Sequence, residues 1–325
     1  MSSPATDPFD DALADLRLSG TALLSCCYPA PWAVDVPGED VLRRWLGAPP
    51  QTRVMVFHCA RSGSFELQRS HGDVLTAAPG EVVVLPAGEP HRLGFDASGS
   101  TPLARLRGVS LQDALAGQGP AKVPLGTPGS TGLLCGAFIA RATPLNPLLG
   151  SLPPVLLAQG AEVEPLRYVL ARLAQALDAG EGTSFRATRL LELLCAELLH
   201  LEQRRARGTG WLASLSDTRL GPALRLLHAE PHAPLSVPRL AAAAALSPSR
   251  FAARFREQMG CSVMQYATDW RMNLACRLLA DDGLSLAEAA QRVGYENIPA
   301  FSRSFKARVG VAPGAWRAQQ RGVGG

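Results

Sequence analysis

Apolar residues follow two different spacings along the 325-residue chain. From about residue 52 to residue 138 they form short runs broken by Gly and Pro, which is typical of strands; the clearest are residues 53–59, 64–69, 81–85 and 133–139. From residue 164 onwards they recur at helical spacing, first in 164–179 and 184–207 and then in shorter helices up to residue 320. The pattern therefore predicts strands first and helices afterwards.

This order predicts an α+β multidomain chain. Its expected parts are a β-rich domain over residues 1–160, a helical connector over 161–210, and an all-α domain over 217–321. Residues 9–20 are predicted to form a short helix, residues 140–162 to be irregular, and Gly208 to Asp217 to be a linker.

Composition narrows the class of protein. Apolar residues make up 47% of the chain and charged residues 18%, and 31 Gly and 26 Pro imply many turns, which excludes a coiled-coil rod, a collagen and a mostly disordered chain. The seven cysteines contain no C-x-x-C pair, which argues against a disulfide scaffold and a zinc ribbon. The acidic first 15 residues do not resemble a signal peptide, and no stretch approaches the roughly 20 apolar residues of a spanning helix. We therefore expect a cytoplasmic protein without a membrane partner.

Charge is unevenly distributed along the chain. The net charge is +4 overall, but residues 217–325 hold 14 Lys and Arg against 8 Asp and Glu, a net +6, whereas residues 1–216 have a net −2. A single basic part is expected when only that part meets a polyanion.

The basic part contains one pattern twice. The marker residues are, in order, Leu240, Phe251, Phe255 and Gly260 in the first copy, and Leu286, Phe301, Phe305 and Gly310 in the second. Each copy predicts a short helix, a tight turn and a second helix, which is the helix-turn-helix layout. The two Phe residues of each second helix lie four apart, so they share a face that must be buried.

The opposite face of each second helix is small, polar and basic. It carries Ser249, Arg250, Ala253, Arg254 and Arg256 in the first copy, and Asn297, Pro299, Ser302, Arg303 and Lys306 in the second. Such a face suits a helix lying in the major groove of DNA, although a single helix of this kind is more often a solvated surface helix. The helix predicted over 263–281 could hold both second helices on successive groove turns, about 34 Å apart.

Residues 217–320 resemble the DNA-binding domain of AraC/XylS-type transcriptional regulators. The resemblance rests on Leu-Ala-Glu-Ala-Ala-Gln-Arg-Val-Gly-Tyr-Glu at 286–296, followed by Phe-Ser-Arg-Ser-Phe-Lys at 301–306 and Gly-Val-Ala-Pro at 310–313. It implies two helix-turn-helix units joined by one long helix. Three departures matter: Ala289 stands where the family usually has Ile, and Ala253 stands where related sequences often carry Arg. Ala245 stands where Gly is common, which is tolerable if that turn avoids positive φ.

These departures assign different roles to the basic residues. Arg303 is the expected direct contact to a base, because the first recognition helix carries Ala253 on its groove face. Arg250, Arg254, Arg256 and Lys306 are expected to meet phosphates, which position a protein on DNA without specifying sequence.

The β-rich part carries a second resemblance. The segment from Gly80 to His91 follows Gly-x5-Pro-x-Gly-x2-His and resembles the second motif of cupins, which are small β-barrels. In metal-dependent cupins this His is one ligand and a His-x-His pair supplies others; here His58 is followed by Cys59 and Ala60, so we expect no iron site and no cofactor. His91 then points into the barrel mouth, where a hydrogen-bonded structural His is the commoner outcome.

The domain order resembles a cupin-type subgroup of AraC regulators, in which the barrel is taken to sense a signal. One interpretation is a small effector in the barrel. Another is cysteine oxidation: Cys26 and Cys27 are expected in a partly exposed segment, with Cys135 or Cys59 as resolving thiols. A third is a metal site formed by His58, His91 and a cysteine; free buried cysteine remains the structural alternative.

The Leu-rich face of residues 190–201 also has two interpretations. It packs within the chain, or it forms a dimer interface, which the resemblance favours because such regulators are commonly dimeric.

Together these features predict a sequence-specific transcription regulator of the bacterial nucleoid, most simply an activator, that is not an enzyme. Its expected partners are double-stranded promoter DNA, RNA polymerase, an unknown small-molecule effector and a second copy of the chain. The alternative is a cupin-type metal-dependent enzyme with a DNA-binding tail, which the missing His-x-His pair disfavours.

Overall fold

The computed structural model describes residues 7–49, 52–141, 143, 145–280 and 284–321. The chain forms two compact units, each built from more than one segment. One unit comprises Leu18–Arg141 and Leu152–Arg204; the other comprises Met1–Arg17, Ala142–Ser151 and Arg205–Gly325. The ranges expected from the sequence were consecutive, 1–160, 161–210 and 217–321. In the structure the helical unit instead includes two short segments of the first 160 residues, so the start of the chain belongs with it.

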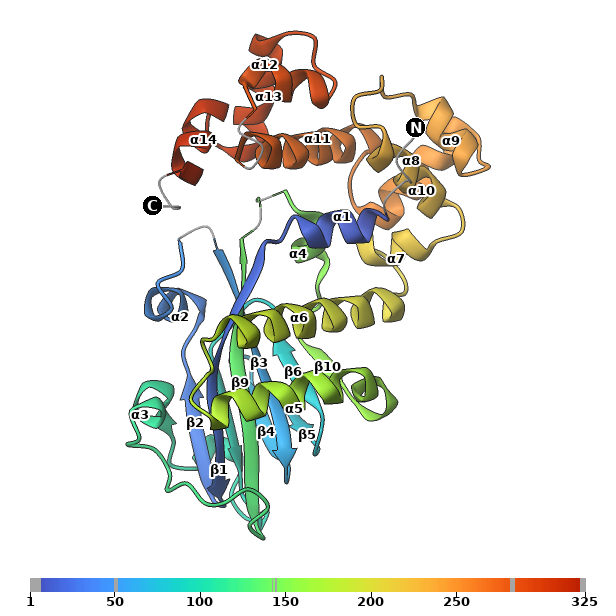
Figure 1. Ribbon diagram of the computed structural model, residues 1–325. Helices are drawn as coiled ribbons and strands as arrows, with labels where there is room; N and C mark the ends of the chain where they lie inside the picture. The colour runs from blue at the N-terminus through green and yellow to red at the C-terminus, as the bar shows by residue number, and fades with distance from the viewer. Residues whose placement is uncertain (1–6, 50–51, 142, 144, 281–283, 322–325) are drawn as a thin grey trace. The chain divides into compact units, whose positions relative to one another are not determined.

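The first unit is built on two five-stranded sheets (Figure 1). The first sheet has the order β1 (Leu18–Pro29), β9 (Ser130–Arg141), β3 (Thr52–Ser62), β6 (Val82–Leu85) and β10 (Leu156–Ala158). The second has the order β5 (Val74–Ala77), β4 (Phe65–Arg69), β7 (His91–Phe95), β2 (Trp32–Val36) and β8 (Val109–Ser110). Their inward side chains form one core, and we call this pair of sheets the barrel. The predicted α+β multidomain class is confirmed.

Strand β3 shows why the strands appear in the sequence as apolar runs and not as alternating apolar and polar residues. Val54 and Val56 face the core between the sheets, while the intervening Met55 and Phe57 are also buried, on the other side. A strand buried on both faces has a nearly continuous apolar run. Helix α5 (Glu164–Asp178) contacts β1, and α6 (Phe185–Arg205) crosses close to Gly20, where a Cβ would lie 3.0 Å from that of Leu191. The remaining helices of this unit are α2 (Glu39–Trp45), α3 (Leu111–Leu115), η1 (Leu103–Arg105) and η2 (Gly160–Val163).

The second unit is helical. Its elements are α1 (Pro8–Ala14), α4 (Pro147–Ser151), α7 (Trp211–Ser216), α8 (Leu220–Ala229), α9 (Val237–Ala243), α10 (Pro248–Met259), α11 (Val263–Ala280), α12 (Leu286–Arg292), α13 (Ile298–Val309) and α14 (Pro313–Arg321). The prediction of one helix over 9–20 was too long, because Arg17 takes φ 41° and the chain enters β1 at Leu18. The expected linker at 208–217 is instead largely helix α7, whose Trp211 is buried.

Within the described ranges, no helix is both long enough and apolar enough to cross a membrane.

Candidate functional site

The two copies of the repeat have the same local construction. Helices α10 and α13 each begin at a side-chain cap: Ser247 Oγ accepts from the backbone N–H of Arg250, and Asn297 Oδ1 accepts from that of Ala300. Each has Pro in its first turn and ends at a Gly with positive φ, 72° at Gly260 and 91° at Gly310. The repeated sequence pattern therefore folds into two equivalent second helices.

The paired phenylalanines anchor both helices, as the sequence predicted. Phe251 and Phe255 are 0% and 1% exposed, and Phe301 and Phe305 are both 0% exposed. The rings within each pair lie with centroids 5.8 Å and 5.7 Å apart. Because this stripe is buried, the opposite face of each helix must point outward.

The outward faces carry cations that have no ion-pair partner among the described residues. Arg250 and Arg256 of α10 are exposed, as are Arg303 and Lys306 of α13. Ser249, Ala253 and Pro299 lie exposed on the same faces. These free cations provide sites for phosphate or base atoms without breaking an internal contact.

Three other predicted DNA-binding residues are less available to DNA, because they are partly buried or bonded within the protein. The Arg254 guanidinium donates to Asp217 Oδ2 over 2.6 Å, which fastens α10 to the start of α8. The Asn297 side chain caps its own helix, and Ser302 is only half-exposed. These residues stay predicted DNA contacts, but contact with DNA through Arg254 competes with its ion pair.

The first turn differs from the expectation for Ala245. Its φ is +51°, so alanine occupies the left-handed region that favours glycine. The matching residue of the second copy is Gly294, with φ +82°. The condition under which alanine would be tolerated, a turn without positive φ, is therefore not met. The turn keeps its left-handed geometry at some cost in backbone strain.

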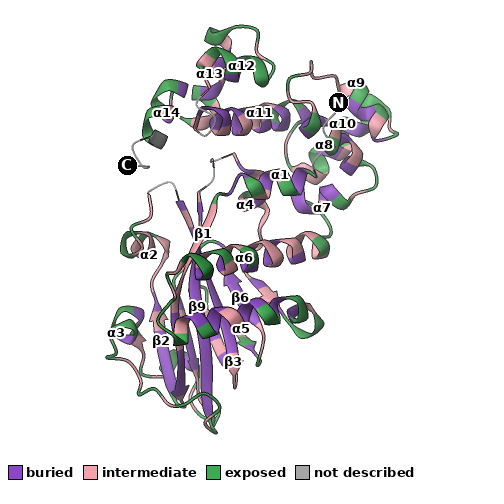
Figure 2. Cartoon of the chain, in the orientation of Figure 1, coloured by how far each residue is buried: buried purple, intermediate pink, exposed green. Residues whose placement is uncertain are grey.

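Helix α11 joins the two copies and contacts α10, α12, α13 and α14. Most of it is buried, in contrast to the outer sides of α12 and α13 (Figure 2). Its Tyr266 hydroxyl accepts from Trp211 Nε1 over 2.6 Å and lies 2.7 Å from His228 Nε2. This polar chain inside an aromatic core was not predicted, because its members are scattered along the sequence.

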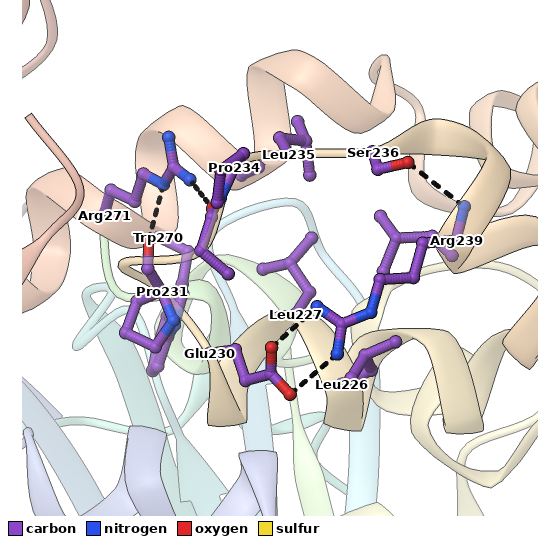
Figure 3. Close-up of a pocket in the computed structure, with 13 residues that line it drawn as sticks. Leu226, Leu227, Glu230, Pro231, Pro234, Leu235, Ser236, Arg239, Trp270 and Arg271 are labelled. Carbon is purple, nitrogen blue, oxygen red and sulfur yellow. Dashed lines mark hydrogen bonds and ion pairs between the residues drawn. The ribbon is translucent and has the colours of Figure 1, made fainter.

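The first helix-turn-helix unit also contains a small surface pocket between α8, α9 and α11 (Figure 3). Arg271 of α11 donates to the carbonyls of Pro231 and Ala233, and Glu230 pairs with Arg239. These bonds fix the loop that leads into α9, so Arg271 positions the unit rather than facing outward. The sequence offered no signal for this role.

The start of the chain is bound to α11. The buried Asp15 carboxylate accepts from Asn273 Nδ2 over 2.7 Å and from Arg277 over 2.6 Å. The Asn273 Oδ1 in turn accepts from the Thr143 hydroxyl, and Asn146 donates to the Ala12 carbonyl. Residues 7–17 and the segment around Asn146 thus form one clasp on the helix between the two copies.

In the barrel, His58 and His91 are brought together. Their Nε2 atoms lie 2.8 Å apart, and the side chains belong to residues only 2% and 6% exposed. The His91 Nδ1 lies 2.8 Å from the Glu89 carbonyl, which can only accept. Burial lowers the pKa of both imidazoles, that of His91 to about 4, so both are neutral at physiological pH.

The cysteine candidates are not where the sequence suggested. Cys26 and Cys27 are 8% and 3% exposed on strand β1, so the expectation of a partly exposed segment was wrong. Burial raises the pKa of Cys26 to about 11 and that of Cys59 to about 12, and it also raises that of Cys135. A buried, protonated thiol is a poor nucleophile, which argues against redox sensing.

The donor set does not fit a metal. Among the residues that the structure describes, no group of three His, Cys, Asp or Glu side chains is placed to hold an ion. His58 and His91 direct their Nε2 atoms at each other instead. The positions of these side chains therefore do not support the third interpretation, a metal site of His58, His91 and a cysteine.

Comparison with known proteins agrees with both halves of this description. A cupin family model matches residues 7–201, and a helix-turn-helix domain model matches residues 240–319. A protein of Streptomyces lividans described as an AraC-like transcription regulator is 30% identical, over 96% of this chain and 98% of its own. The chain belongs to the AraC-like transcription regulators. It is a DNA-binding regulator with a cupin domain, as the sequence predicted.

Two further proteins are similar to this AraC-like regulator, one by sequence and one as a solved structure. The RCS-specific HTH-type transcriptional activator RclR of Escherichia coli is 24% identical over 96% of this chain and 98% of its own. The solved DNA-binding domain of AdpA, a global transcriptional factor in complex with a target DNA, is 30% identical over 33% of this chain and 96% of its own, with a TM-score of 0.32.

Proposed function

We propose that the regulator reads promoter DNA with the outward faces of α10 and α13. The observation that carries this proposal is the repeated construction: two capped helices, each anchored by a buried Phe pair, with unpaired cations opposite. Arg303 is the proposed base contact, because it is exposed and because the equivalent position in the first copy, Ala253, carries no polar side chain. Arg250, Arg256 and Lys306 are proposed phosphate contacts, with Ser249, Pro299, Ser302 and Asn297 beside them.

The proposed signal is a small molecule bound inside the barrel rather than cysteine oxidation. An apolar cavity lies in the core, and its wall includes Leu23 and Leu24 of β1 and Leu133, Cys135 and Gly136 of β9. Strands β1 and β9 pair along their length, with Leu18 opposite Ala140. Residues 7–17, which lead into β1, and Thr143, which follows β9, both belong to the clasp on α11, so a ligand that shifts either strand is proposed to change the population of states of the DNA-binding unit.

A second copy of the chain is the proposed partner of α6. Its outer side carries Phe185, 78% exposed, and Leu193, 46% exposed, one helical stripe on an otherwise polar face. Arg189, on the same side, pairs with Glu192 of its own helix over 2.6 Å and lies over the Phe185 ring, so the exposed apolar pair rather than a charge contact supports a dimer. Leu193→Glu should then give a monomer in light scattering, and Arg167→Gln, which is exposed on α5 and outside the proposed interface, should not.

Activation through RNA polymerase is the proposed outcome of binding. The related protein of Escherichia coli is named an activator. Transcription in vitro from a bound promoter, with purified polymerase and the full chain, tests this direction: increased transcript supports activation, and decreased transcript indicates repression.

Genome-wide footprinting of the full chain tests the proposed function as a whole. We expect a few promoter sites that share two short elements in adjacent groove turns, bound with an affinity that falls steeply with salt because phosphate contacts release counterions. Binding spread evenly over the genome would instead indicate a non-specific DNA binder.

A further inference from the structure

The two barrel histidines form a hydrogen-bond chain with a fixed direction. Because the Glu89 carbonyl can only accept, His91 Nδ1 carries the hydrogen and His91 Nε2 carries a lone pair. His58 Nε2 must therefore donate to His91 Nε2 over 2.8 Å. A neutral imidazole has one hydrogen, so His58 Nδ1 is left as a bare acceptor.

This acceptor has no partner among the described residues, although it is fully buried. His58 is 2% exposed and lines the apolar cavity in the barrel core. Buried polar atoms in folded proteins are nearly always bonded, and an exception calls for an explanation such as a bound molecule. The Glu89–His91–His58 chain keeps this nitrogen from rotating away, because turning the ring would break the bond to His91.

The rest of the cavity wall is apolar. Apart from His58 and the thiol of Cys135, it consists of aliphatic side chains and Gly136: Leu23, Leu24, Val34, Val36, Leu42, Val56, Leu93, Leu111 and Leu133. Within this described wall, no charged group is present to neutralise an ion. A charged ligand would lose its hydration without compensation.

We propose that the barrel binds a compact, uncharged and largely apolar molecule that bears one O–H or N–H group, which donates to His58 Nδ1. A phenol, an alcohol or a small amide has this chemistry. The inference rests on the proposed sensing function and specifies its ligand class. Both imidazoles being neutral is consistent with it, since burial lowers their pKa.

The size of the cavity connects binding to signalling. Its free volume is about 10 Å³, which is the room of a single water molecule. Any larger ligand must move part of the wall, which includes residues of β1 and β9 as well as Leu42 of α2 and Leu111 of α3. Binding is thus coupled to movement of the cavity wall, and the free energy needed to open the cavity lowers the affinity of every ligand, so that ligands without a hydrogen bond to His58 bind most weakly.

Matched pairs of probes test the inference on the full chain. Phenol and anisole, and cyclohexanol and methoxycyclohexane, differ only in having the donor hydrogen replaced by a methyl group. We expect each donor to bind at least about tenfold more tightly than its methyl ether, by calorimetry, since the ether leaves His58 Nδ1 unbonded. The imidazole ¹⁵N resonance of His58 Nδ1 should shift on adding phenol, as for an acquired hydrogen bond.

Variants locate the effect. His58→Leu should abolish the preference for donors, and His58→Asn should restore part of it, because the Asn carbonyl can accept near the same place. Cys59→Ala is the control: it neighbours His58 in β3 but does not line the cavity, and should keep the tenfold preference. If His58→Leu does not fold, the ¹⁵N shift in the wild type decides.

The outcomes separate the inference from the proposed function. Equal binding of donors and ethers overturns the inference but leaves a ligand-binding barrel. Binding of neither kind overturns both. A donor preference that survives in His58→Leu, or an unmoved Nδ1 resonance with bound phenol, shows that another atom accepts the donor and overturns the inference.

Discussion

The Asp15 carboxylate accepts a hydrogen bond from Asn273 over 2.7 Å, across 258 positions of sequence. Asn273 is 0% exposed and its amide is used on both sides, because its oxygen accepts from Thr143. One side chain of α11 therefore holds both segments that continue from β1 and β9. We therefore propose Asn273 as the residue through which movement of either strand would reach the helix between the helix-turn-helix units.

A double-mutant cycle tests this link. Asp15→Ala and Asn273→Ala should each destabilise the helical unit by about 1–3 kcal/mol, because each leaves a buried polar partner unbonded. The double variant should be less destabilised than the sum, with a coupling of about 1–2 kcal/mol by denaturant unfolding. Glu257→Ala, exposed on α10, should show no coupling to Asp15→Ala. Additive effects of Asp15→Ala and Asn273→Ala would mean that the bond contributes nothing.

The strained turn of the first unit provides a second test. Ala245→Gly should stabilise the helical unit by about 0.5–1 kcal/mol, since glycine adopts φ +51° without a steric penalty. The reciprocal change Gly294→Ala should destabilise it, because a Cβ there would lie 2.8 Å from the His232 carbonyl oxygen. Thermal unfolding measures both; a loss of stability in Ala245→Gly contradicts the assigned strain.

The stability of the barrel should depend on pH through His91. Its folded pKa of about 4 is lower than the 6.5 of an unfolded histidine, so the unfolded chain binds more protons between these values. The free energy of unfolding should fall by about 3 kcal/mol as the pH falls from 6.5 to 4 on this account. His91→Gln should have a shallower dependence in this window when thermal unfolding is followed across a pH series. The same slope in both proteins would place the titration elsewhere.

Much of the helical unit was predictable because its signals are local. Caps, turns and the Phe spacing at Phe251, Phe255, Phe301 and Phe305 act within one helix-turn-helix unit, and each element formed close to its expected bounds. The inclusion of Met1–Arg17 and Ala142–Ser151 in the helical unit was not predictable. It depends on Asp15, Thr143 and Asn273 meeting, and no local pattern marks any of them.

The barrel was predictable in part. The motif ending at His91 correctly gave β6 and the turn after it, whereas β1 was missed because its Gly, Ser and Cys residues do not alternate with apolar ones. The exposure of Cys26 and Cys27 was misjudged for the same reason: an unrecognised strand was treated as a surface segment. The His58–His91 bond required a tertiary structure, because the two residues are 33 positions apart.

Competition binding with Arg303→Ala tests the central claim most directly. On a site recovered by footprinting, we expect the variant to lose about 1–3 kcal/mol of binding free energy, while its affinity for random DNA stays nearly unchanged and its specificity is relaxed. Arg256→Ala, a proposed phosphate contact, should instead weaken both by a similar factor and reduce the salt dependence. Equal loss on specific and random DNA for Arg303→Ala, or no loss on either, would contradict the assignment of α13 as the helix that reads bases.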